Sequence, residues 1–526
     1  MPQKPLPPKS SLTMLWLCLG LYLAFNYLSL ILNAGIIVDD WGDIAHNLEC
    51  ASFWECYSAW FPLFSNRPLA PLPITALTFA LGTWYSGYLL INSLLYLLAI
   101  GICAKVIHTL SNRYGAIVFV ILAAIPIIAM PVITSPINQS TATVSFLLWS
   151  ISLLCLMRFV QYGRREDWVW TYGLLILAFL TYEVILPLLV ITVLLPWLIP
   201  TPAIERAYRL FSPRYFVHFL LPVFGILILV TLWQKGIAPQ FMEVDSRLKF
   251  SASHALAKTY TFLQVFYRQI PDLFLKLPSY LGWGGALSAV LGLLTLQLAQ
   301  QFQGLSLTKT SFRFITAALL CFFACALIFV LSNESAVSGG YQARGLSSTW
   351  FAFAILMSAF ATLIQIPSKI RFFVITTLTT LCALCFSAQR EQTSVAWQLQ
   401  ILILQDANRL ISKNALEAGA TVLGDVPHYL ANNYNNEIVF SQPWDFGAAL
   451  AITNANRIKA GPVIDSSRQE LRQLKLFENV VMAQNFSGVT LDNFWVYRFN
   501  IKTHSGTLIR IENATQWETF LNELKK

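Results

Sequence analysis

Charged residues are scarce in this chain of 526 residues. Asp, Glu, Lys and Arg together make up 12% of it, whereas 56% of its residues are hydrophobic and its mean hydropathy is +0.59. In a soluble globular protein roughly a quarter of the residues are charged. The composition therefore excludes an ordinary soluble protein and indicates a chain that folds in a lipid bilayer.

Several familiar catalytic signatures are also missing. The sequence shows no Walker A, GxSxG or GxGxxG motif, no HExxH motif, and no internal repeat or low-complexity segment. Without these patterns nothing indicates a P-loop enzyme, a serine hydrolase, a dinucleotide-binding domain or a zinc protease.

Long apolar runs are abundant, and each run of about 20 residues is long enough to cross a membrane. The first run, 12–38, exceeds the about 7 to 15 residues of a signal-peptide core, so we expect it to remain as a transmembrane helix. The segment 68–82 is shorter and begins with prolines, so it is either re-entrant or a short tilted span. The sequence thus predicts an α-helical polytopic membrane protein with about 11 to 12 transmembrane helices, near 12–37, 86–107, 115–134, 141–158, 168–182, 184–200, 215–233, 280–300, 314–332, 349–366 and 372–388.

The net charge of +9 comes from the membrane part alone. From Gln389 onward there are 13 basic and 13 acidic residues, which leaves 22 basic and 13 acidic residues before it. Because short cytoplasmic loops are enriched in Lys and Arg, this excess sets the orientation and implies no nucleic-acid partner. With a cytoplasmic N-terminus and a segment 68–82 that does not cross, all the short basic loops face inward: Lys105/Arg113, Arg158/Arg164/Arg165, Arg206/Arg209/Arg214, Lys309/Arg313 and Lys369/Arg371. A full crossing by 68–82 would place all five outside, against this rule.

The opposite, extracytoplasmic face then receives most of the acids. We expect it to carry the outer loops 39–66, 235–279 and 333–348, the turn 135–140, and a small soluble α/β domain, 389–526, after the membrane module 1–388. Cys50 and Cys56 both lie in the first of these loops, so they form a disulfide if that compartment is oxidising. The polar residues capable of chemistry gather on this face.

Two adjacent carboxylates, Asp39 and Asp40, follow the first span and precede Trp41. The simple interpretation is a solvated helix end, but acids at a helix C-terminus oppose the macrodipole. A carboxylate pair can act as a general base or hold a divalent cation such as Mg²⁺ or Mn²⁺. We therefore treat both acids as catalytic candidates and Trp41 as a candidate substrate contact.

Two arginines at the same face are candidates for binding phosphate. Arg67, preceded by Asn66, ends the first loop, and Arg344 follows Tyr341 after a Gly-Gly turn. A guanidinium makes forked hydrogen bonds to phosphate oxygens. The competing interpretation is an ordinary interfacial arginine whose head reaches the lipid headgroups.

An acid interrupts a long apolar run at Tyr182-Glu183. A carboxylate at that depth is costly unless it is paired or faces a polar cavity. Glu183 is therefore either a catalytic residue or the structural partner of a cation such as Arg67 or Arg344, and Tyr182 is a candidate substrate contact.

Together these motifs resemble the membrane glycosyltransferases of the GT-C class, especially bacterial O-antigen glucosyltransferases, over roughly residues 12–388. The resemblance implies transfer of a hexose from a polyprenyl-phosphate carrier to a glycan, lipid or protein hydroxyl at the cell envelope, for instance in lipopolysaccharide. It also implies a multi-pass protein of the bacterial inner membrane, with its site and C-terminal domain in the periplasm.

The resemblance assigns roles to individual residues. Asp39 or Asp40 corresponds to the first-loop acid, acting as base or metal ligand, and Asp43 competes with them for that role. Arg67 corresponds to the loop-end position, Glu183 to the Tyr-Glu position, and Arg344 to the basic residue that meets the carrier phosphate. If a single base activates the acceptor hydroxyl for direct displacement, the reaction inverts the anomeric centre.

Three other classes of protein remain open. A polysaccharide polymerase or ligase would use the same kind of carrier. A flippase or transporter usually carries repeats and midplane charges, which are not evident here. A non-catalytic assembly protein would use the C-terminal domain to bind a partner.

Overall fold

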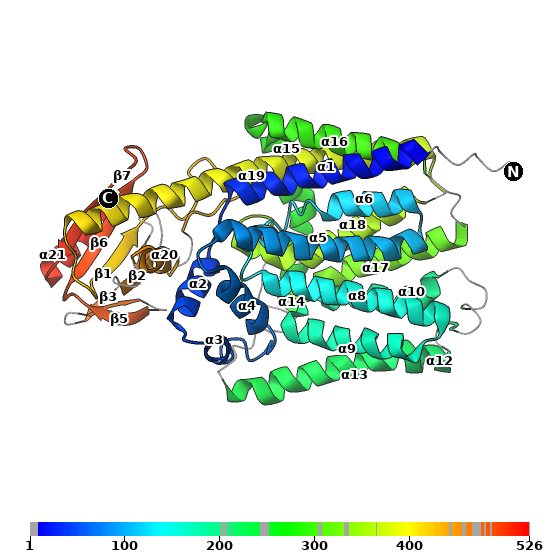
Figure 1. Ribbon diagram of the computed structural model, residues 1–526, viewed down its shortest axis with the longest axis horizontal. Helices are drawn as coiled ribbons and strands as arrows, with labels where there is room; N and C mark the ends of the chain where they lie inside the picture. Colours follow the sequence, from blue (N-terminus) through cyan, green and yellow to red (C-terminus); the bar gives the residue numbers. More distant parts are fainter. Residues whose placement is uncertain are drawn as a thin grey trace.

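The computed structural model describes residues 9–199, 204, 208–210, 212–241, 252–302, 308–330, 336–363, 365–440, 444–454, 459–464, 475–477, 480–483 and 486–524. A bundle of apolar helices forms one end of the molecule and a small sheet domain forms the other (Figure 1). The predicted architecture, a helical membrane protein with a C-terminal α/β domain, is confirmed.

Seven helical segments among the described residues are long and apolar enough to span a membrane. They are Ser10–Asn33, Tyr85–Leu110, Ser140–Tyr162, Pro213–Gln240, Trp283–Gln300, Ser311–Val330 and Ser368–Lys413. In element terms these segments correspond to α1 (Lys9–Asn33), α5 (Tyr85–Leu110), α8 (Ser140–Tyr162), the run from α12 (Pro213–Tyr215) through η2 (Phe216–Leu220), α13 (Leu221–Leu232) and η3 (Trp233–Ile237) to η4 (Ala238–Gln240), α16 (Trp283–Gln300), α17 (Thr308–Val330) and α19 (Ser368–Lys413).

Four of the eleven predicted spans are shorter helices. They are α6 (Arg113–Ala123), α9 (Arg165–Thr181), the pair η1 (Glu183–Leu188) and α10 (Leu189–Leu198), and α18 (Ser347–Ala361).

The predicted span 115–134 is a broken helix that the rest of the bundle encloses. Helix α6 ends at Ala123, three residues before Pro126, and α7 (Pro131–Thr134) follows after a buried turn. Carbonyls in the break accept hydrogen bonds from the side chains of Trp350, Tyr96, Tyr27 and Gln389. Irregular backbone is tolerated at membrane depth when other protein groups satisfy it in this way.

The segment 68–82 does not cross the bundle. Its helix α4 (Pro71–Leu81) has 11 residues and is therefore about 16 Å long, roughly half the thickness of a hydrocarbon core. It packs against α2 (Asp39–Glu49) and α3 (Phe53–Trp60), where Asn47 Nδ2 lies 2.5 Å from Thr78 Oγ1. These three helices form a layer between the bundle and the sheet domain (Figure 1).

Helix α19 connects the two ends of the molecule. It runs unbroken over 46 residues, about 69 Å at 1.5 Å per residue, and extends from the bundle into the sheet domain (Figure 1). The boundary predicted at 388/389 falls inside this helix, so the soluble domain has its first strand only at Thr421.

The C-terminal domain contains a mixed four-stranded sheet in the order β2-β1-β6-β7. The strands are β2 (Lys459–Ile464), β1 (Thr421–Asp425), β6 (Phe494–Asn500) and β7 (Ser505–Ile511), with β1 parallel to both of its neighbours and β7 antiparallel to β6. A second, antiparallel sheet contains β3 (Lys475–Phe477), β4 (Val480–Ala483) and β5 (Phe486–Thr490).

Both faces of the four-stranded sheet are covered. Because successive strand residues point to opposite faces, Val422 packs with α19 and α20 (Asp445–Thr453), whereas Leu423 packs with α21 (Ala514–Leu524). This arrangement explains why all five residues of β1 are buried.

The remaining described helices lie between α13 and α16 along the chain. They are α14 (Ala252–Gln264), η5 (Val265–Gln269), α15 (Ile270–Lys276) and η6 (Leu277–Tyr280). A further turn, η7 (Tyr341–Leu346), precedes α18. The predicted outer loops 235–279 and 333–348 are described only in part. Three acids of these loops, Glu243, Asp245 and Glu334, lie outside the described residues.

Candidate functional site

The two adjacent acids begin a helix instead of ending one. Helix α1 ends at Asn33, and Asp39 and Asp40 are the first two residues of α2. The preceding Val38 has a φ of 53°, a conformation that is strained for a β-branched residue. Carboxylates in the first turn face the positive end of the helix dipole. The sequence suggested that these acids end a helix, where the dipole would oppose their charge. They begin a helix instead, so the dipole favours their charge.

Asp40 is fully buried beneath this turn. Its Oδ1 accepts hydrogen bonds from Ser135 Oγ at 3.0 Å and from the backbone N–H of Asn138 at 2.9 Å. Its Oδ2 is buried and has no hydrogen-bond partner among the described residues. Burial raises the pKa of Asp40 to about 8, although both hydrogen bonds act in the opposite direction. Asp40 is therefore mostly protonated at neutral pH.

Asp39 points instead to a partly open position beside two residues from the distant turn η7. Tyr341 donates to Asp39 Oδ2 at 2.5 Å, and Arg344 Nη1 lies 3.6 Å from the same oxygen. The side chains of Asp39 and Arg344 are 23% and 25% exposed, so both are partly open to solvent. The site thus offers one accessible carboxylate and one accessible guanidinium within a few ångströms.

The turn η7 explains why Tyr341 and Arg344 face the same way. Gly340 has a φ of 66°, which favours glycine, and the 3₁₀ turn that follows aligns residues three apart. The Arg344 guanidinium consequently lies 3.9 Å above the Tyr341 ring. The predicted Gly-Gly turn directs both side chains towards Asp39.

The second arginine, Arg67, forms an ion pair with Glu183. Arg67 makes a forked ion pair with both oxygens of Glu183 and lies 4.3 Å above the Tyr182 ring. Arg67 is thus the partner of Glu183, the first of the two that the sequence suggested. The loop before it is held from η3, because Trp233 donates to the carbonyl of Ser65 at 2.7 Å and Gln234 to that of Asn66 at 3.4 Å.

Trp41 does not belong to this accessible cluster. It is 1% exposed, stacks on Trp397, and donates through Nε1 to Gln400 at 3.0 Å. Its ring joins α2 to the second half of α19. Trp41 is therefore a core residue, and the substrate contact predicted for it is not supported.

Ser135 and Asn138 are two residues of the site that the sequence did not indicate. Both lie in the turn before α8, and both donate to Asp40, while Asn138 Oδ1 also lies 2.9 Å from the Tyr341 hydroxyl. The only signal in the sequence was their place in a predicted outer turn.

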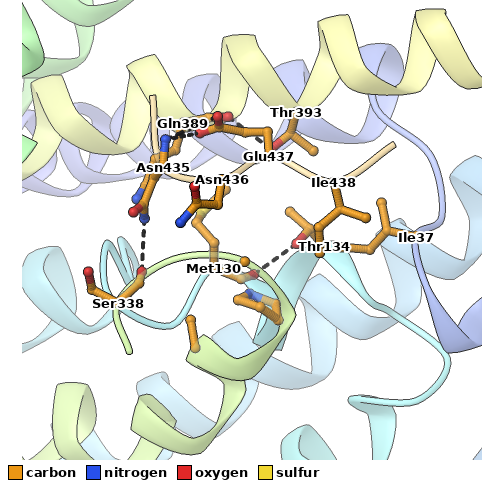
Figure 2. A pocket seen from close by; sticks show the side chains of 13 residues that line it. Ile37, Met130, Thr134, Ser338, Gln389, Thr393, Asn435, Asn436, Glu437 and Ile438 are labelled. Carbon is orange, nitrogen blue, oxygen red and sulfur yellow. Dashed lines mark hydrogen bonds between the residues drawn. The ribbon is translucent and has the colours of Figure 1, made fainter. Parts of the chain in front are cut away.

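A small cavity lies beside η7 and is lined in part by Gly340 and Ala343. Figure 2 shows Gln389 and Thr393 of α19 and Asn435, Asn436 and Glu437 of the C-terminal domain around it. Thr134 and Ser338 of the membrane module complete its polar lining. The cavity therefore lies where the two parts of the chain meet.

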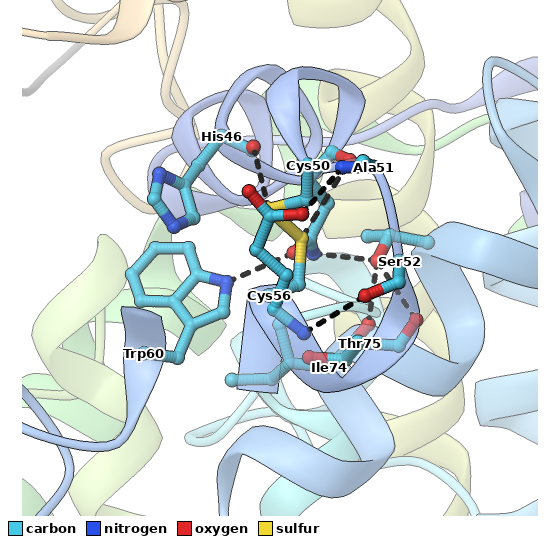
Figure 3. The surroundings of a disulfide bond; sticks show 11 residues. His46, Cys50, Ala51, Ser52, Cys56, Trp60, Ile74 and Thr75 are labelled. Atoms are coloured by element: carbon cyan, nitrogen blue, oxygen red, sulfur yellow. Dashed lines mark hydrogen bonds between the residues drawn. A yellow bond between two sulfur atoms is a disulfide. The ribbon is translucent and has the colours of Figure 1, made fainter. Parts of the chain in front are cut away.

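The predicted disulfide is present between Cys50 and Cys56. It closes the connection between α2 and α3, where Ser52 caps α3 and Trp60 Nε1 donates to Asn47 Oδ1 (Figure 3). The layer of short helices beside the acids is thus covalently fixed.

The two carboxylates do not fit a divalent cation as they stand. Asp39 Oδ2 faces a guanidinium, which would repel a cation, and Asp40 Oδ1 is occupied by two donors. Among the described residues, no group of three or more His, Cys, Asp or Glu side chains is placed to hold a metal. Mg²⁺ and Mn²⁺ usually take about six oxygen ligands, so we assign no reaction step to a metal.

Comparison with known proteins gives distant structural likenesses only. No family model and no curated protein matches the sequence. Among solved structures the chain is similar to ArnT from Cupriavidus metallidurans bound to undecaprenyl phosphate, with 13% identity, 85% of each chain covered and a TM-score of 0.34.

It is also similar to the apo oligosaccharyltransferase of Archaeoglobus fulgidus, with 12% identity and a TM-score of 0.39 over 85% of this chain and 64% of that one. At these TM-scores neither likeness supports a conclusion about the site.

Proposed function

We propose that this chain is a membrane glycosyltransferase that moves a sugar from a polyprenyl-phosphate carrier to a hydroxyl acceptor on the extracytoplasmic face. The observation that carries the proposal is the approach of Arg344 to Asp39, at 3.6 Å, where the apolar helices meet the sheet domain. A lipid-linked phosphosugar needs an apolar surface for its tail, a cation for its phosphate and a base for the acceptor. This end of the bundle supplies all three.

Asp39 is the proposed base, because its side chain is accessible whereas that of Asp40 is buried. The acceptor O–H gives its proton to Asp39 while its oxygen attacks the anomeric carbon. The bond from that carbon to the phosphate oxygen breaks, and the polyprenyl phosphate leaves with the electron pair. Arg344 stabilises the charge on the departing phosphate, and attack opposite the leaving group inverts the anomeric centre.

Glu183 and Arg67 form the rim of the proposed donor site. Arg67 and Tyr182 lie close enough to Arg344 for their charges to act on its guanidinium. Because Arg67 bonds both oxygens of Glu183, whereas Arg344 approaches Asp39 only at 3.6 Å, we assign the carrier phosphate to Arg344 and a shaping role to the Arg67–Glu183 pair.

The disulfide supports the sidedness of the proposal. A Cys50–Cys56 bridge persists in an oxidising compartment, and the basic loops predicted to face the cytoplasm connect helices at the other end of the bundle (Figure 1). We therefore place the site in the periplasm of a bacterium, at the inner membrane. Delivery of a hexose to an O-antigen or another cell-envelope glycan is the finer part of this proposal.

The test uses the full-length protein in membrane fractions with labelled polyprenyl-phosphate sugar. We expect Asp39→Asn to lower the transfer rate by about a hundredfold or more, the usual range for a lost general base, at unchanged expression. Transfer at the wild-type rate by this variant would refute the assignment. The mass of surface glycans then separates two reactions: a missing hexose indicates single-sugar transfer, whereas shortened chains indicate a polymerase or ligase.

A further inference from the structure

A hairpin of the C-terminal domain reaches into the membrane module. We name residues 429–438 the strap; Tyr429 and Ile438 pair across it. At its tip Tyr434 is fully buried within the core of the bundle, where its hydroxyl donates to the carbonyl of Leu273 at 2.8 Å and lies 3.1 Å from Cys385 Sγ. The strap is therefore anchored to α15 and α19.

Two further donors fix the strap from the membrane module. The Tyr280 hydroxyl donates to the carbonyl of Asn433 at 3.0 Å, and Lys276 Nζ donates to that of Tyr434 at 3.3 Å. Within the strap, the carboxylate of Glu437 accepts the backbone N–H groups of Tyr434 and Asn435. The tip thus has a defined conformation as well as a defined place.

From this place the strap holds the turn that carries Arg344. The carbonyl of Asn435 accepts the N–H of Gly340 at 3.2 Å, and Asn435 Nδ2 donates to the carbonyl of Ser338 at 2.8 Å (Figure 2). A side chain at Gly339 would come within 2.5 Å of Asn435, so only glycine allows this approach.

The same turn is held from a second side by η5. Gln269, the last residue of that π-helical turn, accepts the N–H of Ser338 through Oε1 at 2.7 Å. Turns of this kind occur frequently at functional sites. Beside Gly340 and Ala343 lies the cavity of Figure 2 in place of packed side chains. The Ser338–Gly340 turn is thus hydrogen-bonded both by the strap and by η5.

We infer that Asn435 and Gln269 are positioning residues of the active site, because together they fix the Ser338–Gly340 turn that aims Tyr341 and Arg344 at Asp39. The inference rests on the proposed function and gives the C-terminal domain a part in it. Neither residue touches the donor. They act by keeping the Arg344 guanidinium where the carrier phosphate arrives.

The kinetic experiment compares Gln269→Leu, which removes the acceptor, with Gln269→Glu, which keeps it. We expect Gln269→Leu and Asn435→Ala to lower kcat/KM by about five- to tenfold, the size of one lost hydrogen bond, chiefly through a higher KM for the donor. Gln269→Glu should remain close to wild type. The matched control is Asn432→Ala, an exposed asparagine of the same strap, with no expected change.

A double-mutant cycle with Arg344→Ala separates positioning from general damage. If the two residues act through Arg344, Gln269→Leu should cause no further loss in the Arg344→Ala background. A full additional loss there, or equal kinetics for Gln269→Leu and wild type, would overturn the inference.

Hydrogen exchange provides a readout that does not depend on activity. The amides of Ser338 and Gly340 should exchange faster in Gln269→Leu than in wild type or Asn432→Ala. Faster exchange in a protein that transfers no sugar would reject the proposed function and keep the positioning role. Unchanged exchange in an active enzyme would reject the positioning role alone.

Discussion

Replacing Asp40 by asparagine should distinguish the role of Asp40 from that of Asp39. The Asp40→Asn and Asp39→Asn variants should differ in both stability and transfer rate. Asp40 is fully buried, and burial raises its pKa from 3.8 to about 8. An asparagine has nearly the same shape as the protonated acid, and its oxygen can still accept from Ser135 and Asn138. The variant should therefore fold well and lose less than about tenfold in transfer rate, whereas Asp39→Asn should lose about a hundredfold or more.

The effect on stability follows from proton binding. Between pH 4 and pH 8 the folded protein keeps a proton on Asp40 that the unfolded chain has released, so the wild type loses stability as pH rises through this window. At 1.36 kcal/mol per pKa unit, the shift from 3.8 to about 8 sets an upper bound of about 6 kcal/mol at pH 8. Asp40→Asn cannot ionise, and this contribution to the pH dependence should disappear.

The assay is thermal unfolding in detergent at pH 5 and pH 8. The Tm of Asp40→Asn should exceed that of the wild type by more at pH 8 than at pH 5. Glu49→Gln, an exposed acid on the same helix, serves as the control and should follow the wild type. Equal pH dependence in all three proteins would show that Asp40 is ionised in the folded state. Loss of transfer in Asp40→Asn but not in Asp39→Asn would reverse the assigned roles.

Three further outcomes are expected. Arg344→Ala should weaken donor binding by about 10- to 100-fold, as for a lost charged hydrogen bond, with part of the affinity kept in Arg344→Lys; initial rates at varied donor concentration measure both. Arg67→Ala should lower the Tm more than the double variant Arg67→Ala/Glu183→Gln, because the single change leaves an acid without this cation. Cys50→Ser should cost about 2 kcal/mol for the short loop closed by Cys56, and in the wild type both thiols should react with maleimide only after reduction.

Hydropathy was sufficient to predict the class of fold but not the continuity of each helix. A run such as 115–134 is apolar both when it faces lipid and when other helices surround it. Here the neighbours cover it fully, and side chains such as Trp350 and Gln389 satisfy the carbonyls where Pro126 interrupts the helix. Both donors lie far away in the sequence, so the hydropathy of the run alone predicts a single span.

The site shows the same division between local and distant information. Local chemistry was enough to select Asp39, Glu183 and the two arginines, since charged groups at the ends of apolar runs are costly without a purpose. The sequence offers Arg67 and Arg344 as partners for Glu183 without choosing between them, because Arg67 lies 116 residues away. It does not indicate that Tyr341 meets Asp39 across 302 residues. Hydropathy does not show the break between α1 and α2 either, because residues 34–38 are as apolar as the helix before them.

The sequence does not reveal the role of the C-terminal strap, because the strap acts largely through its backbone. The acceptor for Gly340 is a backbone carbonyl at Asn435, and any residue type would supply that atom. What the sequence does specify is indirect: a tyrosine long enough to reach Leu273, a glutamate that folds the tip, and glycines that permit close approach. Each of these acts on the backbone of a neighbour and not on a substrate. A variant of Tyr434 or Glu437 should therefore impair transfer although neither side chain approaches the donor, because the backbone they hold determines where the Arg344 guanidinium lies.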